Sequence, residues 1–378
     1  MILEMVEFGR LADLCRRLRA SPARLDKLAL LAEYLRALPA DAVGTAVAFL
    51  AGRAFPASDA RVLGVRGLPD AAATTGPPLS LADVAAAFAA VADAGGAGAR
   101  RAREELLRGL MARASTDERE TLQRIVAGEM RTGVSDGLVL DAIGRAFETP
   151  LETARRAALL LGDLSGVAAL AARGGATALA SATARPGVPL LPMLAQIADD
   201  FEEVLAAHGG TSALEYKYDG ARIQLHHDGE RIGIWTRRLS DVTASLPDVV
   251  ETARGELAAS PFILDGEVLA LDAAGRPLPF QELMRRFRRV HEVERLVREM
   301  PLTLHFFDCL MAEGRSLIDE PYRRRWEKMV AVTGGRHLAE RTIVTSPEAA
   351  RGFLAQALAA GHEGVMAKDL RRDRKSVV

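Results

Sequence analysis

The chain has 378 residues, a length that predicts two domains. Hydrophobic residues make up 49% and charged residues 26%, a composition that excludes a protein that is disordered throughout. The formal net charge is −1, so binding to nucleic acid must use a local basic patch rather than the field of the whole molecule.

The first half of the chain has the spacing of amphipathic helices. Capping-box sequences begin at Ser80 and Ser115 and predict a helix start at each. Almost no period-two alternation occurs before residue 185, so we predict an all-helical N-terminal domain over residues 1–185. Its other helices are expected over 27–37, 41–53, 100–113 and 136–147, and further ones towards residue 180.

The pattern changes after residue 185. Beyond a helix expected from Met193 to about His208, short apolar strands alternate with Asp-Gly turns. We therefore predict a second domain of α+β class over residues 186–378, built on antiparallel sheets. The expected strands cover 215–220, 221–229, 231–238, 262–271 and 302–310, and helical stretches are expected at 280–299 and 347–360.

Cysteine usage and hydropathy indicate a cellular compartment. Cys15 and Cys309 lie far apart in the sequence, which argues against a disulfide scaffold and fits a reducing cytosol. No apolar stretch reaches the length of a membrane span, and the N-terminus has no export signal. We expect a cytoplasmic protein without a membrane partner.

Lysine is rare in this chain, and one lysine stands in a conspicuous context. Only five of the 49 basic residues are lysine, and Lys217 lies in the segment EYKYDGAR, residues 215–222. An arginine in its place could not act as a nucleophile, because a guanidinium is never neutral at working pH. A hairpin with an Asp219-Gly220 turn and a solvated Lys217 explains this segment about equally well.

Charged and aromatic residues recur at the ends of the strands expected in the second domain. Glu267 interrupts an apolar strand, which suggests a polar cleft, because a buried unpaired charge is costly. A plain Asp265-Gly266 turn is the alternative there, and spacing alone favours an aromatic core for both Phe306 and Phe307. Together these segments supply cations for phosphates, acids for a metal and a ring for a base, as a nucleotide site requires. The segments are TRR at 236–238, LDGE at 264–267, FFD at 306–308 and EGVMAK at 363–368.

The ordered series KYDGAR, TRR, LDGE, FFD and EGVMAK resembles the nucleotidyltransferase motifs of ATP-dependent DNA ligases of archaeal and actinobacterial type. Upstream, residues 185–195 resemble the segment that leads into the adenylation domain of that family. Residues 48–56 and 128–147 resemble its helical DNA-binding domain. The KxDG motif by itself is shared with RNA ligases and capping enzymes, whereas the helical half is specific to DNA ligases.

The resemblance implies a reaction at Lys217. Its amine would attack the α-phosphate of ATP and expel pyrophosphate to leave a lysyl-AMP. The AMP would pass to the 5′-phosphate of a nick in duplex DNA, and the adjacent 3′-hydroxyl would displace it. The amine must be neutral to attack, so nearby cations, Arg222, Arg237 and a bound Mg²⁺, are expected to lower its pKa.

The resemblance also implies binding roles for other residues. Glu215 would accept a hydrogen bond from the adenine amino group, and Phe307 would stack on the purine. Arg222 and Arg237 would contact the ribose and the phosphates. Glu267 would bind the ribose or Mg²⁺, and Glu363 would be a Mg²⁺ ligand. The arginine runs 285–289 and 323–325 are candidate contacts to the DNA backbone, with solvated helix faces as an equal alternative.

The end of the chain departs from the family. A further motif with lysines that contact the α-phosphate and an OB-fold domain would follow EGVMAK in the family, and neither is found here. Residues 373–378 resemble the translation of a sequencing-library adapter, so we expect the natural protein to be longer. By itself the chain is expected to self-adenylate very slowly or not at all.

These observations predict an ATP-dependent DNA ligase, monomeric and associated with the nucleoid, that serves DNA replication, repair and recombination and thereby cell division. The alternatives are another covalent nucleotidyltransferase, such as an RNA ligase or a capping enzyme, and a non-catalytic protein that binds nicked DNA. An NAD-dependent ligase is disfavoured because the sequence has no cysteine-rich zinc module.

Overall fold

The structure is a computed structural model that describes residues 6–57, 59, 61–74, 76–193, 195–272, 275–287 and 293–374. The chain divides into two compact units, Met1–Thr183 and Ala184–Val378. The division lies at 183/184, and the sequence pattern predicted it at 185/186. No helix within the described residues combines the length and the hydrophobicity that a bilayer crossing needs.

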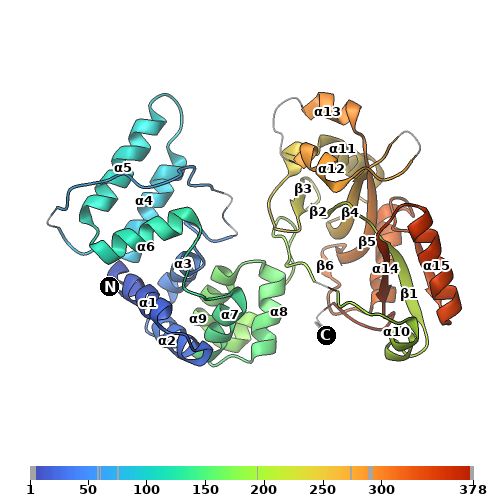
Figure 1. Cartoon of the computed structure of the whole chain (residues 1–378), viewed down its shortest axis with the longest axis horizontal. Helices are drawn as coiled ribbons and strands as arrows, with labels where there is room; N and C mark the ends of the chain where they lie inside the picture. The colour runs from blue at the N-terminus through green and yellow to red at the C-terminus, as the bar shows by residue number, and fades with distance from the viewer. Residues whose placement is uncertain are drawn as a thin grey trace. The chain divides into compact units, whose positions relative to one another are not determined.

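The first unit consists of helices in its described elements (Figure 1). Both capping boxes form: the Ser80 hydroxyl accepts from the backbone of Asp83, and the Ser115 hydroxyl accepts from the backbone of Glu118. The helices are α1 (Phe8–Ala20), α2 (Arg24–Arg36), α3 (Ala40–Leu50), α4 (Leu81–Asp93), α5 (Ala99–Arg113), α6 (Thr116–Ala127), α7 (Asp136–Ala146), α8 (Leu151–Leu161) and α9 (Leu164–Ala180).

Three phenylalanines join the first helices of this unit. Phe8 of α1 meets Phe49 of α3 edge-to-face at 6.2 Å between ring centroids, and Phe49 meets Phe88 of α4 in the same way at 5.9 Å. All three side chains are fully buried. The helical prediction is confirmed, although α1 was not among the predicted helices.

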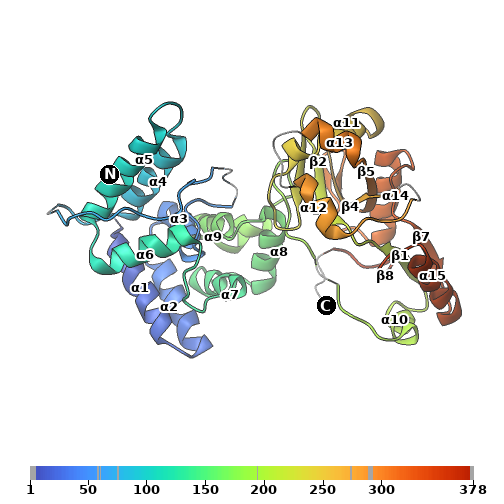
Figure 2. The same ribbon diagram turned by 45° about the horizontal axis from the view of Figure 1, so that its top comes forward.

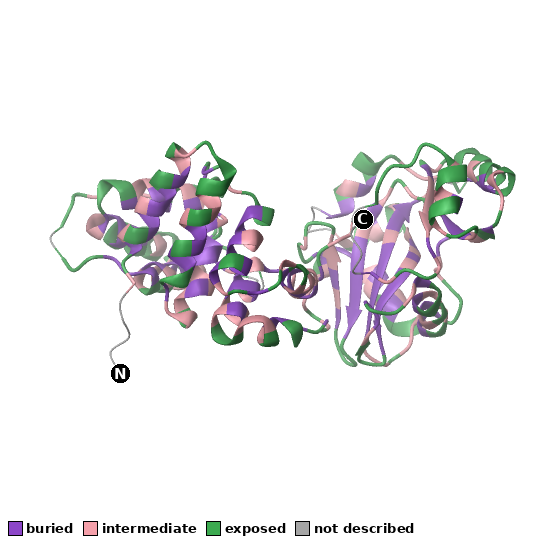
Figure 3. Cartoon of the chain, turned by 90° about the horizontal axis from the view of Figure 1, so that it is seen from below, coloured by how far each residue is buried: buried purple, intermediate pink, exposed green. Residues whose placement is uncertain are grey.

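The second unit contains two antiparallel sheets. The five-stranded sheet has the order β3-β2-β4-β5-β6, and the three-stranded sheet has the order β7-β1-β8. Buried residues are concentrated on the strands (Figure 3). The strands are β1 (Ser212–Lys217), β2 (Ala221–His227), β3 (Ile232–Thr236), β4 (Phe262–Ala270), β5 (Leu302–Ala312), β6 (Arg315–Ser316), β7 (Arg341–Val344) and β8 (Gly364–Lys368).

Helices cover one face of each sheet. The apolar face of the five-stranded sheet packs against side chains from α11 (Pro247–Glu256), α12 (Phe280–Phe287) and α14 (Tyr322–Thr333). The three-stranded sheet packs against α10 (Phe201–Ala207) and α15 (Pro347–Ala359), as Figure 2 shows for α15 beside β1, β7 and β8. The other face of the larger sheet includes the polar side chains Arg222 and Asp265, and that of the smaller sheet includes Glu215 and Lys217.

Two predicted helices are shorter than expected. The helix predicted from Met193 to about His208 is limited to α10, because Asp200 has an extended backbone and its side chain accepts from the backbone N–H of Glu202. The stretch predicted at 280–299 contains α12 and α13 (Val293–Glu299), and residues 288–292 between them lie outside the described residues.

Both Asp-Gly pairs that could have been simple turns have other roles. β1 and β2 belong to different sheets, so the hairpin alternative around Asp219-Gly220 is wrong. A Cβ at Gly220 would lie 2.4 Å from the carbonyl oxygen of Val268, which requires glycine where the chain passes from one sheet to the other. Asp265-Gly266 lies inside the continuous strand β4, so the turn alternative is wrong there as well.

Candidate active site

Lys217 lies at the end of β1, the central strand of the smaller sheet. Successive side chains of a strand point to opposite faces, so Glu215 and Lys217 share one face and Tyr216 lies on the other, where its ring packs on Phe353 of α15 at 5.0 Å. The Lys217 ammonium contacts the Glu363 carboxylate, and its side chain is 49% exposed. Lys217 is thus an accessible amine on a strand that is paired on both sides.

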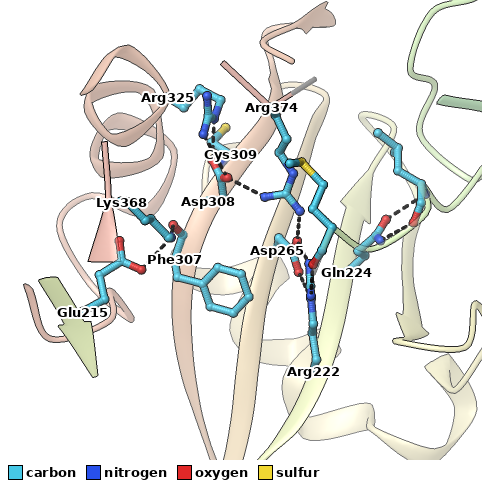
Figure 4. A network of polar contacts seen from close by, with 12 residues as sticks. Glu215, Arg222, Gln224, Asp265, Phe307, Asp308, Cys309, Arg325, Lys368 and Arg374 are labelled. Atoms are coloured by element: carbon cyan, nitrogen blue, oxygen red, sulfur yellow. Dashed lines mark hydrogen bonds and ion pairs between the residues drawn. The ribbon is translucent and has the colours of Figure 1, made fainter. Parts of the chain in front are cut away.

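Glu215 is buried on the same face of β1. The Tyr322 hydroxyl donates to its Oε1, and Lys368 Nζ lies 2.5 Å from its Oε2. Lys368 Nζ also donates to the Phe307 carbonyl at 2.7 Å, so it joins β8 to β5 (Figure 4). Burial raises the pKa of Glu215, and the charge of Lys368 opposes that rise.

Arg222 occupies the polar face of the larger sheet. Its Nε and Nη2 donate to the two carboxylate oxygens of Asp265 at 3.0 and 2.7 Å. Its Nη1 donates to the Met193 carbonyl at 3.0 Å, and its guanidinium lies 5.6 Å from the centre of the Phe307 ring. This bidentate pair fixes the direction of the guanidinium.

Phe307 reaches the site because β5 contains a bulge. Asp265 pairs with Asp308 and Gly266 with Phe306, which leaves Phe307 as the extra residue. Phe306 is fully buried in the core, whereas the partly exposed Phe307 ring lies within 4.9 Å of Lys368 Nζ. The spacing-based expectation of a core position is confirmed for Phe306 and wrong for Phe307.

The two carboxylates predicted to bind metal differ in environment. Burial raises the pKa of Glu267 to about 8, Arg222 opposes the rise, and Asp265 adds to it. The Glu363 side chain is 42% exposed. Within the described part of the chain, no group of three or more His, Cys, Asp or Glu side chains is arranged to hold a metal. These acids can therefore supply only part of a metal's ligand shell.

Arg237 lies beyond the end of β3 and is exposed. Its charge lowers the pKa of Glu267, so the two side chains interact electrostatically. The site residues predicted from the sequence therefore come from both sheets: Glu215 and Lys217 from β1, Arg222 from β2, Glu267 from β4 and Phe307 from β5, with Arg237 and Glu363 next to strand ends.

Comparison with known proteins decides the family. The profile of the ATP dependent DNA ligase domain matches residues 192–375, and that of the DNA ligase N terminus matches residues 69–144. The chain is 45% identical to a probable DNA ligase of Anaeromyxobacter dehalogenans, over 96% of this chain and 71% of that protein. It is 37% identical to a DNA ligase of Methanopyrus kandleri, over 96% of this chain and 73% of that protein.

The chain belongs to the ATP-dependent DNA ligase family. The solved structure Pmar-Lig_PreS3 has the same fold, with a TM-score of 0.56 at 17% identity over 96% of this chain and 74% of that chain. ATP is therefore the nucleotide substrate, and DNA is the polymer that this ligase family joins. The RNA ligase and capping-enzyme alternatives are accordingly wrong.

The ligase site also contains residues to which the sequence analysis gave no role. Asp265 and Asp308 are both buried on the polar face of the larger sheet. Arg325 of α14 pairs with Asp308 at 2.8 Å. Arg374, which lies in the segment 373–378 that resembles adapter sequence, bridges Asp308 and Asp265. Figure 4 shows this network beside Arg222. The acid at the end of the FFD motif could have pointed to Asp308. Its arginine partners could not be inferred from the motif, because they come from distant segments of the chain.

The two arginine runs of the ligase contain buried as well as exposed arginines, and Arg288 and Arg289 of the first run lie outside the described residues. Arg325 is buried in its ion pair, and its neighbour Arg324 is exposed. Arg286 is also buried; it pairs with Asp248 at 2.6 Å and donates to the Met300 carbonyl. Among the described residues, Arg286 and Arg325 therefore have a structural role, and the exposed Arg285, Arg323 and Arg324 stay candidate contacts to the DNA backbone.

Proposed function

We propose that this ligase seals nicks in duplex DNA through a lysyl-AMP formed on Lys217. The half-exposed Lys217 amine, held on β1 beside Glu215 and Glu363, supports this proposal most directly. In the first step, a bond forms between Nζ and the α-phosphorus while the bond to pyrophosphate breaks and Nζ loses a proton. The amine must separate from Glu363 for this, because the protonated form has no lone pair.

Other residues of the two sheets can bind the adenine base, the ribose and the phosphates of ATP. Glu215 can accept a hydrogen bond from the exocyclic amine of adenine, and the partly exposed Phe307 ring can stack on the purine. Arg222 and Arg237 would contact the ribose and the phosphates of ATP. The charges of Arg222 and Arg237 both act on Glu267, and we propose that its carboxylate contacts the ribose or a cation.

We propose that Mg²⁺ is coordinated partly by the two carboxylates and partly by groups that do not belong to the protein. Mg²⁺ is commonly held by one or two carboxylates together with substrate phosphates and water, and Glu267 and Glu363 supply such a pair. Burial raises the pKa of Glu267 even though Arg222 and Arg237 oppose the rise, and a divalent cation at this carboxylate would favour its charged form. Once bound, the metal would stabilise the charge that develops on the phosphate.

The helical unit is proposed to hold the duplex on either side of the nick. The match of residues 69–144 to the DNA ligase N terminus supports this assignment. With a net charge of −1 for the whole chain, such binding would depend on local basic patches and would be salt-dependent. We propose that the enzyme acts at the nucleoid in the cytoplasm, in replication, repair and recombination.

Incubation with ATP labelled at the α-phosphate tests the chemistry. In the full-length enzyme, a covalent adduct that is stable to denaturation and absent from Lys217→Met is the expected result. Transfer of the label to the 5′-phosphate of nicked DNA, and not to nicked RNA, then tests the substrate. An adduct that forms equally in Lys217→Met would refute the assignment of the nucleophile.

A further inference from the structure

Tyr322 begins α14 and reaches the buried carboxylate of Glu215, the residue proposed to contact the adenine base. Its side chain is almost fully buried, at 1% exposure, and its hydroxyl donates to Glu215 Oε1. Lys368 holds the other oxygen, Oε2, at 2.5 Å. Two elements far apart in the sequence, α14 and β8, therefore fix both oxygens of one glutamate on β1.

Cations lie near the Tyr322 ring. Lys368 Nζ lies 4.9 Å from the centre of the Tyr322 ring and 4.9 Å from that of Phe307. The Arg341 guanidinium lies 5.2 Å from the centre of the Tyr322 ring and 4.2 Å from that of Trp326. Cation–π contacts of this kind hold a ring in place. The direction of the Tyr322 hydroxyl is consequently set by packing.

We propose that Tyr322 is a positioning residue that sets the purine preference of this ligase, by fixing Glu215 as an acceptor for the exocyclic amine of adenine. The inference rests on the proposed contact between Glu215 and the base. An ionised carboxylate has about four acceptor positions, so two remain after Tyr322 and Lys368 have bound. A guanine presents a carbonyl oxygen at the same ring position and would meet an acceptor instead of a donor.

Loss of the Tyr322 hydroxyl would weaken that discrimination for two reasons. The carboxylate of Glu215 would lose the contact that fixes its rotation. Burial already raises the pKa of Glu215, and Tyr322 is one of the two groups whose hydrogen bonds oppose the rise. A Glu215 that takes up a proton becomes a donor, which a 6-oxo purine can accept.

The test compares Tyr322→Phe with wild type for binding of three nucleotides by calorimetry: ATP, GTP, and purine riboside triphosphate, which lacks the 6-amino group. Wild type is expected to prefer ATP over each of the other two by about tenfold or more, the value of a hydrogen bond to a charged group. In Tyr322→Phe this preference should fall by about tenfold. The whole chain is used, and circular dichroism checks its fold.

Tyr216→Phe is the matched control. Tyr216 is the neighbour of Glu215 in β1, and its ring packs on the opposite face against Phe353. It undergoes the same chemical change, so its nucleotide preferences should equal those of wild type. General damage to the pocket in Tyr322→Phe would weaken the binding of all three nucleotides alike and leave the ratios of their dissociation constants unchanged.

The outcomes separate the two levels of the proposal. Wild type that binds ATP and the purine analogue equally well would refute the contact of Glu215 with the base, and the role of Tyr322 with it. Wild type that prefers ATP, with unchanged ratios in Tyr322→Phe, would refute the role of Tyr322 alone. A loss of preference in both tyrosine variants would also refute it, because the effect would then not depend on the hydroxyl at Glu215.

Discussion

The ammonium of Lys217 contacts the carboxylate of Glu363 at the point where β1 and β8 pair, with Lys217 opposite Gly364. The backbone N–H of Glu363 also donates to the Lys217 carbonyl at 3.1 Å, so the acid is attached to the strand end that carries the nucleophile. The pair keeps the amine next to a carboxylate before ATP binds, and a cation that engages Glu363 would free it.

Replacement of Lys217 by arginine should abolish the lysyl-AMP adduct and leave the fold intact. The side chain is half exposed, so the larger guanidinium has room, but it stays protonated and cannot attack phosphorus. The measurement is label transfer from ATP to protein on a denaturing gel. Lys328→Arg is the control, because Lys328 pairs with Glu313 on the surface. A labelled Lys217→Arg protein would be incompatible with the mechanism.

Removal of either proposed metal ligand should spare folding and impair catalysis. In the full-length enzyme, Glu363→Ala and Glu267→Ala are each expected to lower strand joining by about 10²–10³-fold, because a group that stabilises developing phosphate charge contributes at that scale. Rates of nick sealing over a range of Mg²⁺ concentrations measure the effect. Glu313→Ala, an exposed acid paired with Lys328, serves as control. Wild-type rates in both variants would return these acids to structural roles.

The raised pKa of Glu267 predicts a pH-dependent stability. Burial raises this pKa from 4.5 to about 8, so the folded protein holds a proton that the unfolded chain releases within that interval. The free energy of unfolding should therefore fall as pH rises from about 4.5 to about 8. Glu267→Gln stays neutral and should become more stable than wild type by about 1–3 kcal/mol at pH 8.

Urea denaturation at pH 5 and pH 8.5 measures this difference. Glu327 is a surface acid paired with Arg324, and Glu327→Gln should have the same dependence of the free energy of unfolding on pH as wild type. Equal pH dependence in wild type and Glu267→Gln would mean that Glu267 ionises normally in the folded protein.

The buried ion pair of Arg325 and Asp308 should be critical for the adenylation unit. Arg325→Leu would leave the buried Asp308 with fewer cations, and breaking a buried pair costs about 3–5 kcal/mol. Arg324→Leu, at the exposed neighbouring position, should change stability by less than about 1 kcal/mol. Chemical denaturation compares the two, and similar losses in both would contradict the structural role of the pair.

Acid should weaken the same network. The arginines around Asp308 hold its pKa well below the ordinary value. Its stabilising contribution is therefore present above the pKa of the unfolded chain and is lost as pH falls towards the folded value. Wild type should lose stability below about pH 4, the ordinary pKa range of aspartate, and Asp308→Asn should lose less over the same interval.

The helical unit is expected to bind duplex DNA without the second unit. Residues 1–183 form a compact unit with their own core, so they can be expressed alone. Binding should be weak, independent of sequence and steeply reduced by salt, because phosphate contacts release counterions. Fluorescence anisotropy with a labelled duplex between low and moderate salt measures it, and no binding at low salt would contradict the assignment.

The sequence by itself determined the local elements of this protein and the residue types of its site. The apolar spacing predicted helices such as α3 and α7, and the serine capping boxes located the starts of α4 and α6, because those signals act within one or two turns. The motif residues Lys217, Arg222 and Glu267 were found for a similar reason, since each stands out within its own short segment.

Only the tertiary structure decided which of these segments meet. The separation of β1 from β2 depends on strand pairing with β7, β8 and β4, which come much later in the chain. The bulge that turns Phe307 to the site depends on the register between β4 and β5. Tyr322 and Arg325 reach Glu215 and Asp308 because α14 packs on β5. Such contacts join residues that are distant in sequence, so no local pattern of the chain contains them.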